Sequence, residues 1–161
     1  MIRAFQRHCN FSSQSANKPR PEWFNREKIF DSFLSTLDDR VDYTAFHDSG
    51  NGSIEDHFLN NKEVNKITKF GGNDAQSFLN LLNYVVEQDY NADDIIYFVE
   101  DDYLHKEGWI DILLEGFDKI GAAVRFQSTP SVSSLYIIPR DRSFTYRPSS
   151  LYNIIVFSAN V

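Results

Sequence analysis

Two kinds of apolar segment alternate along residues 1–120. One kind is short and rich in β-branched and aromatic residues, which is typical of strands. The other repeats its apolar residues every three or four positions, which indicates helices with one buried face. Alternation of this kind predicts an α/β fold, in which a mostly parallel sheet is flanked by helices on both faces. The expected strands are residues 1–9, 41–48, 63–70 and 93–99, and the expected helices are residues 26–37, 54–61, 74–88 and 106–120.

The composition suits a single soluble domain. The chain has 161 residues, of which 42% are hydrophobic, so it can bury a sizeable core. A net charge of −7 argues against nonspecific nucleic-acid binding and against a basic membrane-binding surface. Cys9 is the only cysteine, so no intramolecular disulfide can form. With no apolar run long enough to span a membrane and no signal-peptide pattern, we expect a cytoplasmic protein.

The pattern changes after about residue 121. The remaining chain is rich in Ser, Pro and Arg, and Asp141 is its only acidic residue. Two short strands are expected there, at residues 134–139 and 151–157. We therefore divide the chain into a domain over residues 1–120 and an atypical tail over residues 121–161 that continues the same domain.

Three consecutive carboxylates, Glu100, Asp101 and Asp102, directly follow the most apolar expected strand, IIYFV. Ligands of open parallel sheets collect at the carboxyl ends of the strands, where Asp48 and the GGN turn at residues 71–73 are also expected. Three adjacent carboxylates repel one another and need a counter-charge, and hard divalent cations prefer oxygen ligands. The sequence therefore favours a cation site at this edge. The alternative is a solvated strand end that caps the next helix.

Three segments in this order resemble family 2 glycosyltransferases, which have the nucleotide-diphospho-sugar transferase (GT-A, Rossmann-like) fold. FHDSGNGSIEDHF resembles the family's strand and Asp-Gly-Ser turn, and FGGNDAQSFLNLLNYVVEQ resembles its Asn-Gly turn and following helix. DDIIYFVEDDYLHKEGWIDILLEGF resembles its acidic metal-binding motif. The resemblance covers about residues 1–120. It implies a metal-dependent transfer of a sugar from a nucleotide-diphosphate donor to an acceptor hydroxyl, on a glycan, lipid or protein, with inversion of the anomeric centre.

The resemblance also implies roles for individual residues. Asp48 would accept a hydrogen bond from the nucleotide base, and Gln6 and Arg7 at the end of the first strand would flank that base. Glu100 and Asp101 would line the ribose and diphosphate, and Asp102 would be the main ligand of Mn²⁺ or Mg²⁺. The implied nucleotide-binding residues are Gln6, Arg7, Asp48, Asn73, Asp74, Glu100 and Asp101, and the implied metal ligands are Asp102 and Glu100.

The chain also departs from the family pattern. Its acidic motif is Glu-Asp-Asp rather than the more usual Asp-x-Asp, and nothing after residue 121 matches the second half that carries the catalytic base and the acceptor site. We therefore expect a fold that is incomplete at its C-terminus, with its catalytic residues unassigned. One alternative is a non-catalytic, truncated domain that binds nucleotide sugars. Another is a receiver-like domain with Asp141 as the phosphate acceptor, although no lysine follows Lys119.

Overall fold

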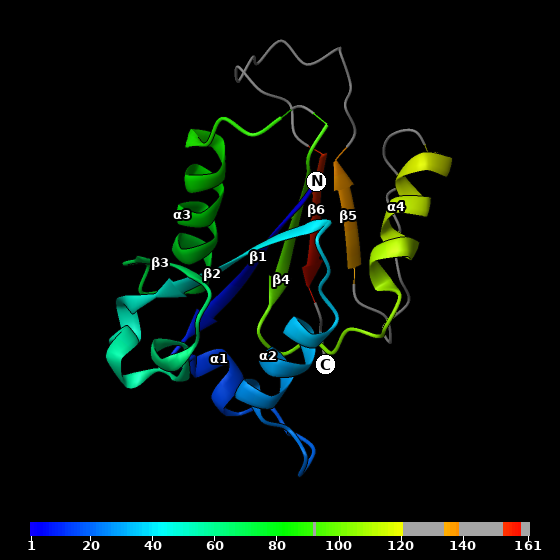
Figure 1. Cartoon of the computed structure of the whole chain (residues 1–161). Helices are drawn as coiled ribbons and strands as arrows, with labels where there is room; N and C mark the ends of the chain where they lie inside the picture. Colours follow the sequence, from blue (N-terminus) through cyan, green and yellow to red (C-terminus); the bar gives the residue numbers. More distant parts are fainter. Residues whose placement is uncertain (92, 121–133, 139–152, 159–161) are drawn as a thin grey trace.

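The computed structural model describes residues 1–91, 93–120, 134–138 and 153–158. These residues form one sheet in the order β3-β2-β1-β4-β6-β5 (Figure 1). Its four-stranded part, β3-β2-β1-β4, is entirely parallel. Strand β6 continues it in parallel beside β4, and β5 is antiparallel to β6. The strands are β1 (Ile2–Cys9), β2 (Val41–Asp48), β3 (Asn65–Lys69), β4 (Ile95–Glu100), β5 (Ser134–Ile138) and β6 (Asn153–Ser158).

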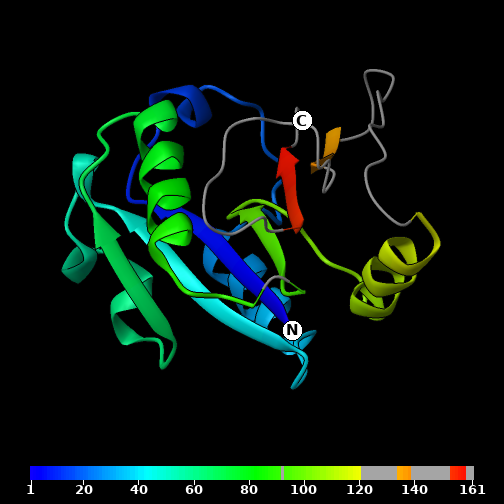
Figure 2. The same cartoon turned by 90° about the horizontal axis from the view of Figure 1, so that it is seen from above.

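Helices cover both faces of the parallel strands (Figures 1 and 2). Residues of α2 and α4 pack on one face, and residues of α3 pack on the other. Asparagine side chains begin two of these helices: Asn25 accepts a hydrogen bond from the Lys28 amide, and Asn73 accepts one from the Gln76 amide, both at 2.9 Å. The helices are α1 (Ser13–Ala16), α2 (Arg26–Ser35), α3 (Asp74–Glu87) and α4 (Trp109–Ile120), with 3₁₀ turns η1 (Ser49–Asn51), η2 (Ile54–Asp56) and η3 (Phe58–Asn61).

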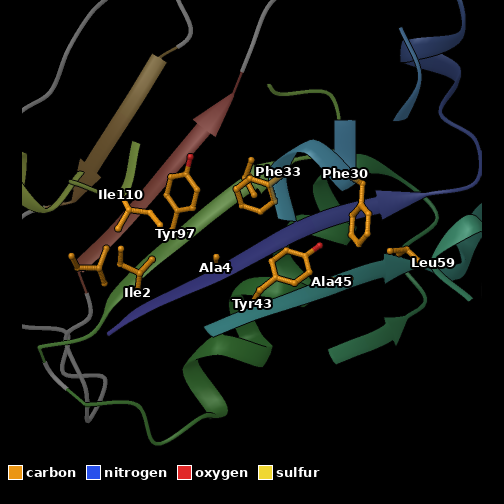
Figure 3. Packing of buried hydrophobic residues seen from close by; sticks show 11 residues of the cluster. Ile2, Ala4, Phe30, Phe33, Tyr43, Ala45, Leu59, Tyr97 and Ile110 are labelled. Atoms are coloured by element: carbon orange, nitrogen blue, oxygen red, sulfur yellow. The ribbon is translucent and has the colours of Figure 1, made fainter. Parts of the chain in front are cut away.

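The sheet separates two apolar clusters. On the α2 and α4 face, Phe30 and Phe33 pack against inward-facing strand residues such as Tyr43 (Figure 3). On the α3 face, Leu81 and Val85 pack against phenylalanines of β1, β2 and β4. Successive strand residues point to opposite faces, and β1 and β4 contribute residues to both clusters. This burial on both faces explains the continuous apolar run IIYFV of β4.

The predicted α/β class, parallel strands and flanking helices are confirmed in residues 1–120. The predicted helix over residues 54–61 is instead two 3₁₀ turns, because the backbone of His57 between them is extended. A short helix, α1, lies where a loop was expected, and the Ser12 side chain accepts from the Ser15 amide at its start. Residues 121–133 and 139–152, including Asp141, lie outside the described residues.

The parallel strands begin at one edge of the sheet and end at the opposite edge, and these two edges are named after the strand ends that lie there. The amino-end edge is where β1 and β4 begin, and it is closed by ion pairs: Arg3 Nε lies 2.9 Å from Asp94 Oδ2, and Arg3 Nη1 lies 2.5 Å from Asp42 Oδ2. The N-terminal amino group of Met1 also lies 3.3 Å from Asp94. The carboxyl-end edge is where these strands end. In the described part of the chain, no helix is long and apolar enough to cross a membrane.

Candidate functional site

A polar pocket of about 330 Å³ lies at the carboxyl-end edge. Its wall combines the ends of β1, β2 and β4 with the first turn of α3, the start of α2 and the segment that contains α1. In Figure 1, α1 lies just beyond the arrowhead of β1. The lining residues are Arg7, His8, Cys9, Phe11, Ser12, Ser13, Ser15, Lys18, Arg26, Asp48, Asn51, Gly72, Asn73, Asp74, Ser77, Glu100, Asp101 and Asp102.

Asp48 connects two loops at one end of this pocket. Its Oδ1 accepts hydrogen bonds from the amides of Gly50 at 2.8 Å, Gly71 at 2.8 Å and Gly72 at 3.2 Å. Burial acts to raise the pKa of Asp48, but these amides and the Ser77 side chain outweigh it and leave the pKa below its ordinary value. The charge of Asp48 is therefore stabilised by the protein itself. Its carboxylate links the loop at Gly50 to the loop at residues 71–72.

The two loops approach each other so closely that only glycine fits. A Cβ atom on Gly50 would lie 2.2 Å from the Cα of Gly72, and one on Gly71 would lie 2.6 Å from Asp48 Oδ2. Gly72 also has a φ of 75°, which lies in the left-handed region that favours glycine. Gly72, which lines the pocket, therefore contributes only backbone to its wall.

Each carboxylate of the acidic triplet lies beside an arginine. The arginines come from three places in the sequence: the end of β1, the segment before α2 and the first residue of α2. The counter-charge that three adjacent acids require is therefore present within the chain. The nearest nitrogen–oxygen distances are 2.6 Å for Glu100–Arg7, 3.2 Å for Asp101–Arg26 and 2.9 Å for Asp102–Arg20.

Arg7 joins β4 to α3. Its Nε and Nη2 both donate to Glu100 Oε1, and the guanidinium also donates to the backbone carbonyl and the Oδ1 of Asp74 in the first turn of α3. Its guanidinium lies 5.4 Å from the ring centroid of Phe78. Arg7 thus stabilises the contact between the end of β4 and the start of α3 on the α3 side of the pocket.

The α2 side is less well satisfied. Arg26 Nε and Asp101 Oδ2 are close, but they are not aligned for a hydrogen bond, and both atoms are buried without a hydrogen-bond partner among the described residues. Burial raises the pKa of Asp101 to about 7, against the opposing charge of Arg26. His8 is 2% exposed, and neither ring nitrogen has a hydrogen-bond partner among the described residues. Burial lowers the pKa of His8 well below its ordinary value, so the ring is neutral at pH 7.

The resemblance implied a divalent cation at Asp102 and Glu100. Within the described ranges, no group of three or more His, Cys, Asp or Glu side chains is placed to hold a metal ion. Arginine already engages Oε1 of Glu100 and Oδ2 of Asp102. Magnesium typically uses one or two protein carboxylates together with substrate phosphates. In the described structure, these two residues therefore do not form a cation cage by themselves.

The structure places most of the predicted site residues together. Gln6 is the exception: it is fully buried beneath the pocket, donates to the Glu100 carbonyl at 3.3 Å and accepts from the Tyr43 hydroxyl at 3.0 Å. It supports the end of β4 from below and does not line the pocket. The predicted residues that do line it are Arg7, Asp48, Asn73, Asp74, Glu100, Asp101 and Asp102.

Sequence reasoning missed the wall formed by residues 11–18 and the start of α2. Phe11 is 54% exposed and lines the pocket just after β1. Lys18 also lines it, and its ammonium has no ion-pair partner among the residues that the structure describes. An exposed aromatic residue directly after a strand end was the available signal for Phe11. Nothing in the sequence indicated that Arg26 lies beside Asp101.

The fold and the pocket together define a small α/β domain with a four-stranded parallel sheet and a polar site at the carboxyl-end edge. The chain matches no protein-family model, no curated protein and no solved structure.

Proposed function

We propose that the pocket binds a nucleotide-diphosphate sugar and that the protein is a glycosyltransferase of the nucleotide-diphospho-sugar transferase type. The observation that carries the proposal is the meeting of Asp48, the glycine turn and the acidic triplet in one pocket. These segments are far apart in the sequence, and they meet at the sheet edge where open parallel sheets bind ligands.

The newly identified wall supports a nucleotide ligand. Phe11 offers an exposed aromatic face, and stacking of a base on such a face contributes about 1–3 kcal/mol. Lys18, the serine hydroxyls of residues 12–15 and the first turn of α3 offer donors for phosphate oxygens. The base therefore lies on Phe11, and the diphosphate lies between Lys18 and the start of α3.

The charge of the pocket supports a shared cation. Its lining has five acidic and three basic side chains, so a diphosphate entering alone would meet a net negative wall. Mn²⁺ or Mg²⁺ held by Glu100, Asp102 and the phosphates would neutralise this charge and that of the departing diphosphate. Arg7 holds the end of β4 against α3 and so keeps Glu100 in place.

A second candidate is a domain that binds the donor without catalysis. The specific observation in its favour is that four of the five lining carboxylates, Asp48, Asp74, Glu100 and Asp102, already accept hydrogen bonds from protein donors. Such engaged carboxylates are poor bases for an acceptor hydroxyl. In this case the same pocket holds the nucleotide sugar for another protein.

Calorimetric titration with uridine and guanosine diphosphates, with and without MnCl₂, tests the proposal. We expect the wild type to bind one of them in a manganese-dependent way. Asp102→Asn should lose about ten-fold in affinity together with the manganese dependence. Arg20→Ala keeps the carboxylate and removes the guanidinium bound to it, so it should keep the manganese dependence and bind at least as tightly as the wild type. If manganese does not change the affinity of any of the three proteins, the proposed cation site is refuted. If the wild type binds neither nucleotide, the proposed nucleotide site is refuted.

Aromatic stacking is tested with a matched pair. Phe11→Ala should weaken diphosphate binding at least five-fold, since it removes the stacking face. Phe70→Ala should leave binding unchanged, because Phe70 is 74% exposed but does not line the pocket. Release of free sugar from the conjugated donors, followed by chromatography, then separates an enzyme from a binding domain.

A further inference from the structure

Buried polar atoms without hydrogen-bond partners lie on one side of the pocket. Among the described lining residues they are both ring nitrogens of His8, Nε of Arg26 and Oδ2 of Asp101. In folded proteins nearly all buried polar atoms have a hydrogen-bond partner, so a group of exceptions in one pocket requires an explanation. A ligand that supplies the partners is such an explanation.

These residues share the α2 face of the sheet. The His8 ring lies 5.6 Å from the ring of Phe30 in α2 and 5.8 Å from the ring of Phe58, measured between centroids. Arg26 is the first residue of α2, and its Nε lies 3.2 Å from Asp101 Oδ2. Arg7, by contrast, bonds to Asp74 at the start of α3. The pocket therefore has a satisfied α3 side and an unsatisfied α2 side.

The charge of the α2 side selects the kind of ligand group. The charges of Arg26 and Asp101 oppose each other, and His8 is neutral, so this side offers no net attraction to a phosphate. It does offer donors and acceptors within a few ångströms of each other. Neighbouring hydroxyl groups, which both donate and accept hydrogen bonds, match this arrangement.

We infer that His8, Arg26 and Asp101 form the subsite for the sugar part of the donor, whose hydroxyl groups complete their hydrogen bonds. This inference rests on the proposed function and deepens it. The Asp101 carboxylate, which the resemblance placed at the ribose and diphosphate, is here assigned to the sugar instead and accepts from one of its hydroxyls. The Arg26 guanidinium donates to a neighbouring hydroxyl oxygen. His8 forms the floor and can donate or accept according to its tautomer. The three residues then determine which sugar is bound.

The experiment compares each nucleoside diphosphate with its sugar conjugate: uridine diphosphate with its glucose conjugate, and guanosine diphosphate with its mannose conjugate. Calorimetry gives the affinity ratio of conjugate to diphosphate. We expect a ratio of about ten or more in the wild type for the conjugate that fits. His8→Phe and Asp101→Asn should lower this ratio about five-fold or more while leaving the affinity for the diphosphate within two-fold. Arg26→Lys, which keeps the charge but not the fork of donors, should do the same and serves as a further variant if another fails to fold.

The chain offers matched controls. His105 also has a buried ring nitrogen without a hydrogen-bond partner among the described residues, but it lies outside the pocket. Asp94 is also buried, and it lies at the amino-end edge. His105→Phe and Asp94→Asn should therefore keep the wild-type ratio.

The remaining outcomes each decide the inference. Equal loss of affinity for diphosphate and conjugate would place these residues at the nucleotide and overturn the sugar subsite, without harming the proposed function. An unchanged ratio in all three variants would also overturn it. If the wild type binds no nucleotide, the proposed function fails, and saturation-transfer NMR with free glucose and mannose at millimolar concentration decides the subsite. Transfer that His8→Phe and Asp101→Asn abolish would support it, and no transfer to the wild type would overturn it.

Discussion

The same two strands, β1 and β4, have an arginine between two carboxylates at each end. At the amino-end edge Arg3 contacts Asp42 and Asp94, and at the carboxyl-end edge Arg7 contacts Asp74 and Glu100. The two triads have similar distances, and the pocket of about 330 Å³ lies beside the triad of the carboxyl-end edge. Charge at a strand end is therefore a poor sign of a site by itself. What distinguishes the site is the space beside the triad and the buried polar atoms that remain without partners there.

The largest effect should come from the backbone wall of the carboxyl-end edge. Gly71→Ala would place a Cβ atom 2.6 Å from Asp48 Oδ2 and 2.8 Å from the Cα of Ser77, so the loop would have to move. We expect a loss of about 3 kcal/mol in the free energy of unfolding, measured by urea denaturation. Gly116→Ala in α4 is the control, since its Cβ would meet nothing within 4 Å, and a gain of up to about 1 kcal/mol is expected. Equal stability of Gly71→Ala and the wild type would show that the loops are not interlocked.

The amino-end edge should matter for stability but not for binding. Asp94 is 3% exposed and accepts from Arg3 while it also contacts the N-terminal amino group. Asp94→Asn should lower the free energy of unfolding by about 2 kcal/mol, as expected for the loss of a hydrogen bond between charged groups. Nucleotide affinity should stay within two-fold of wild type by calorimetry. A large loss of nucleotide affinity in the folded variant would contradict the claim that the amino-end edge affects only stability.

Acid pH should weaken the layer beneath the carboxyl-end edge. Burial lowers the pKa of His57 to about 4, with neighbouring His47 and Arg26 contributing, whereas an unfolded histidine has a pKa of about 6.5. Between these values the unfolded chain binds a proton that the folded protein does not bind, so stability from this residue falls as the pH falls from about 6.5 to 4. His57→Gln removes this loss.

Urea denaturation at pH 7, 6 and 5 measures the difference between His57→Gln and the wild type. The free energy of unfolding of the variant, relative to that of the wild type, should rise by about 1 kcal/mol for each pH unit below 6.5. Glu100 and Asp101, whose pKa values are raised by burial, act in the opposite sense, but they do so in both proteins and cancel from the difference. If the difference in free energy of unfolding between the two proteins stays constant with pH, the folded protein would protonate His57 near pH 6.5, as the unfolded chain does.

The smallest effect should come from a third triad, centred on Arg40, whose three side chains all lie at the surface. Arg40 contacts Asp38 and Asp111, and all three side chains are well exposed. Exposed ion pairs contribute little because water and salt screen them. Arg40→Ala should therefore leave the urea midpoint unchanged within error, and a clear shift would show that this triad supports the fold as the Arg3 triad does.

The fold was largely predictable because it depends on local patterns. Alternating apolar periods predicted the order of the parallel strands and of the helices α2, α3 and α4. The 3₁₀ turns were not predicted, because the sequence of residues 54–61 does not reveal that the backbone of His57 is extended.

The site was predictable only in part because it depends on distant contacts. The need of Glu100, Asp101 and Asp102 for a counter-charge could be inferred from their sequence, but its source could not. Arg20, which contacts Asp102, is 82 positions away in the chain, and nothing local distinguishes an arginine partner from a cation. For the same reason Asp48 was expected to be available to a base, whereas three backbone amides already donate to it.

The pair between Arg20 and Asp102 has a consequence for any cation that reaches this edge. Pro19 and Pro21 flank Arg20 and restrict its backbone, so the unbound segment has less freedom to lose when the guanidinium meets the carboxylate. An incoming ion therefore competes with a tethered guanidinium at high effective concentration and not only with water. Added salt weakens the ion pair between Arg20 and Asp102 as it weakens other ion pairs. The measured affinity for a cation therefore depends on how readily the segment before α2 releases Asp102, and not only on the carboxylate itself.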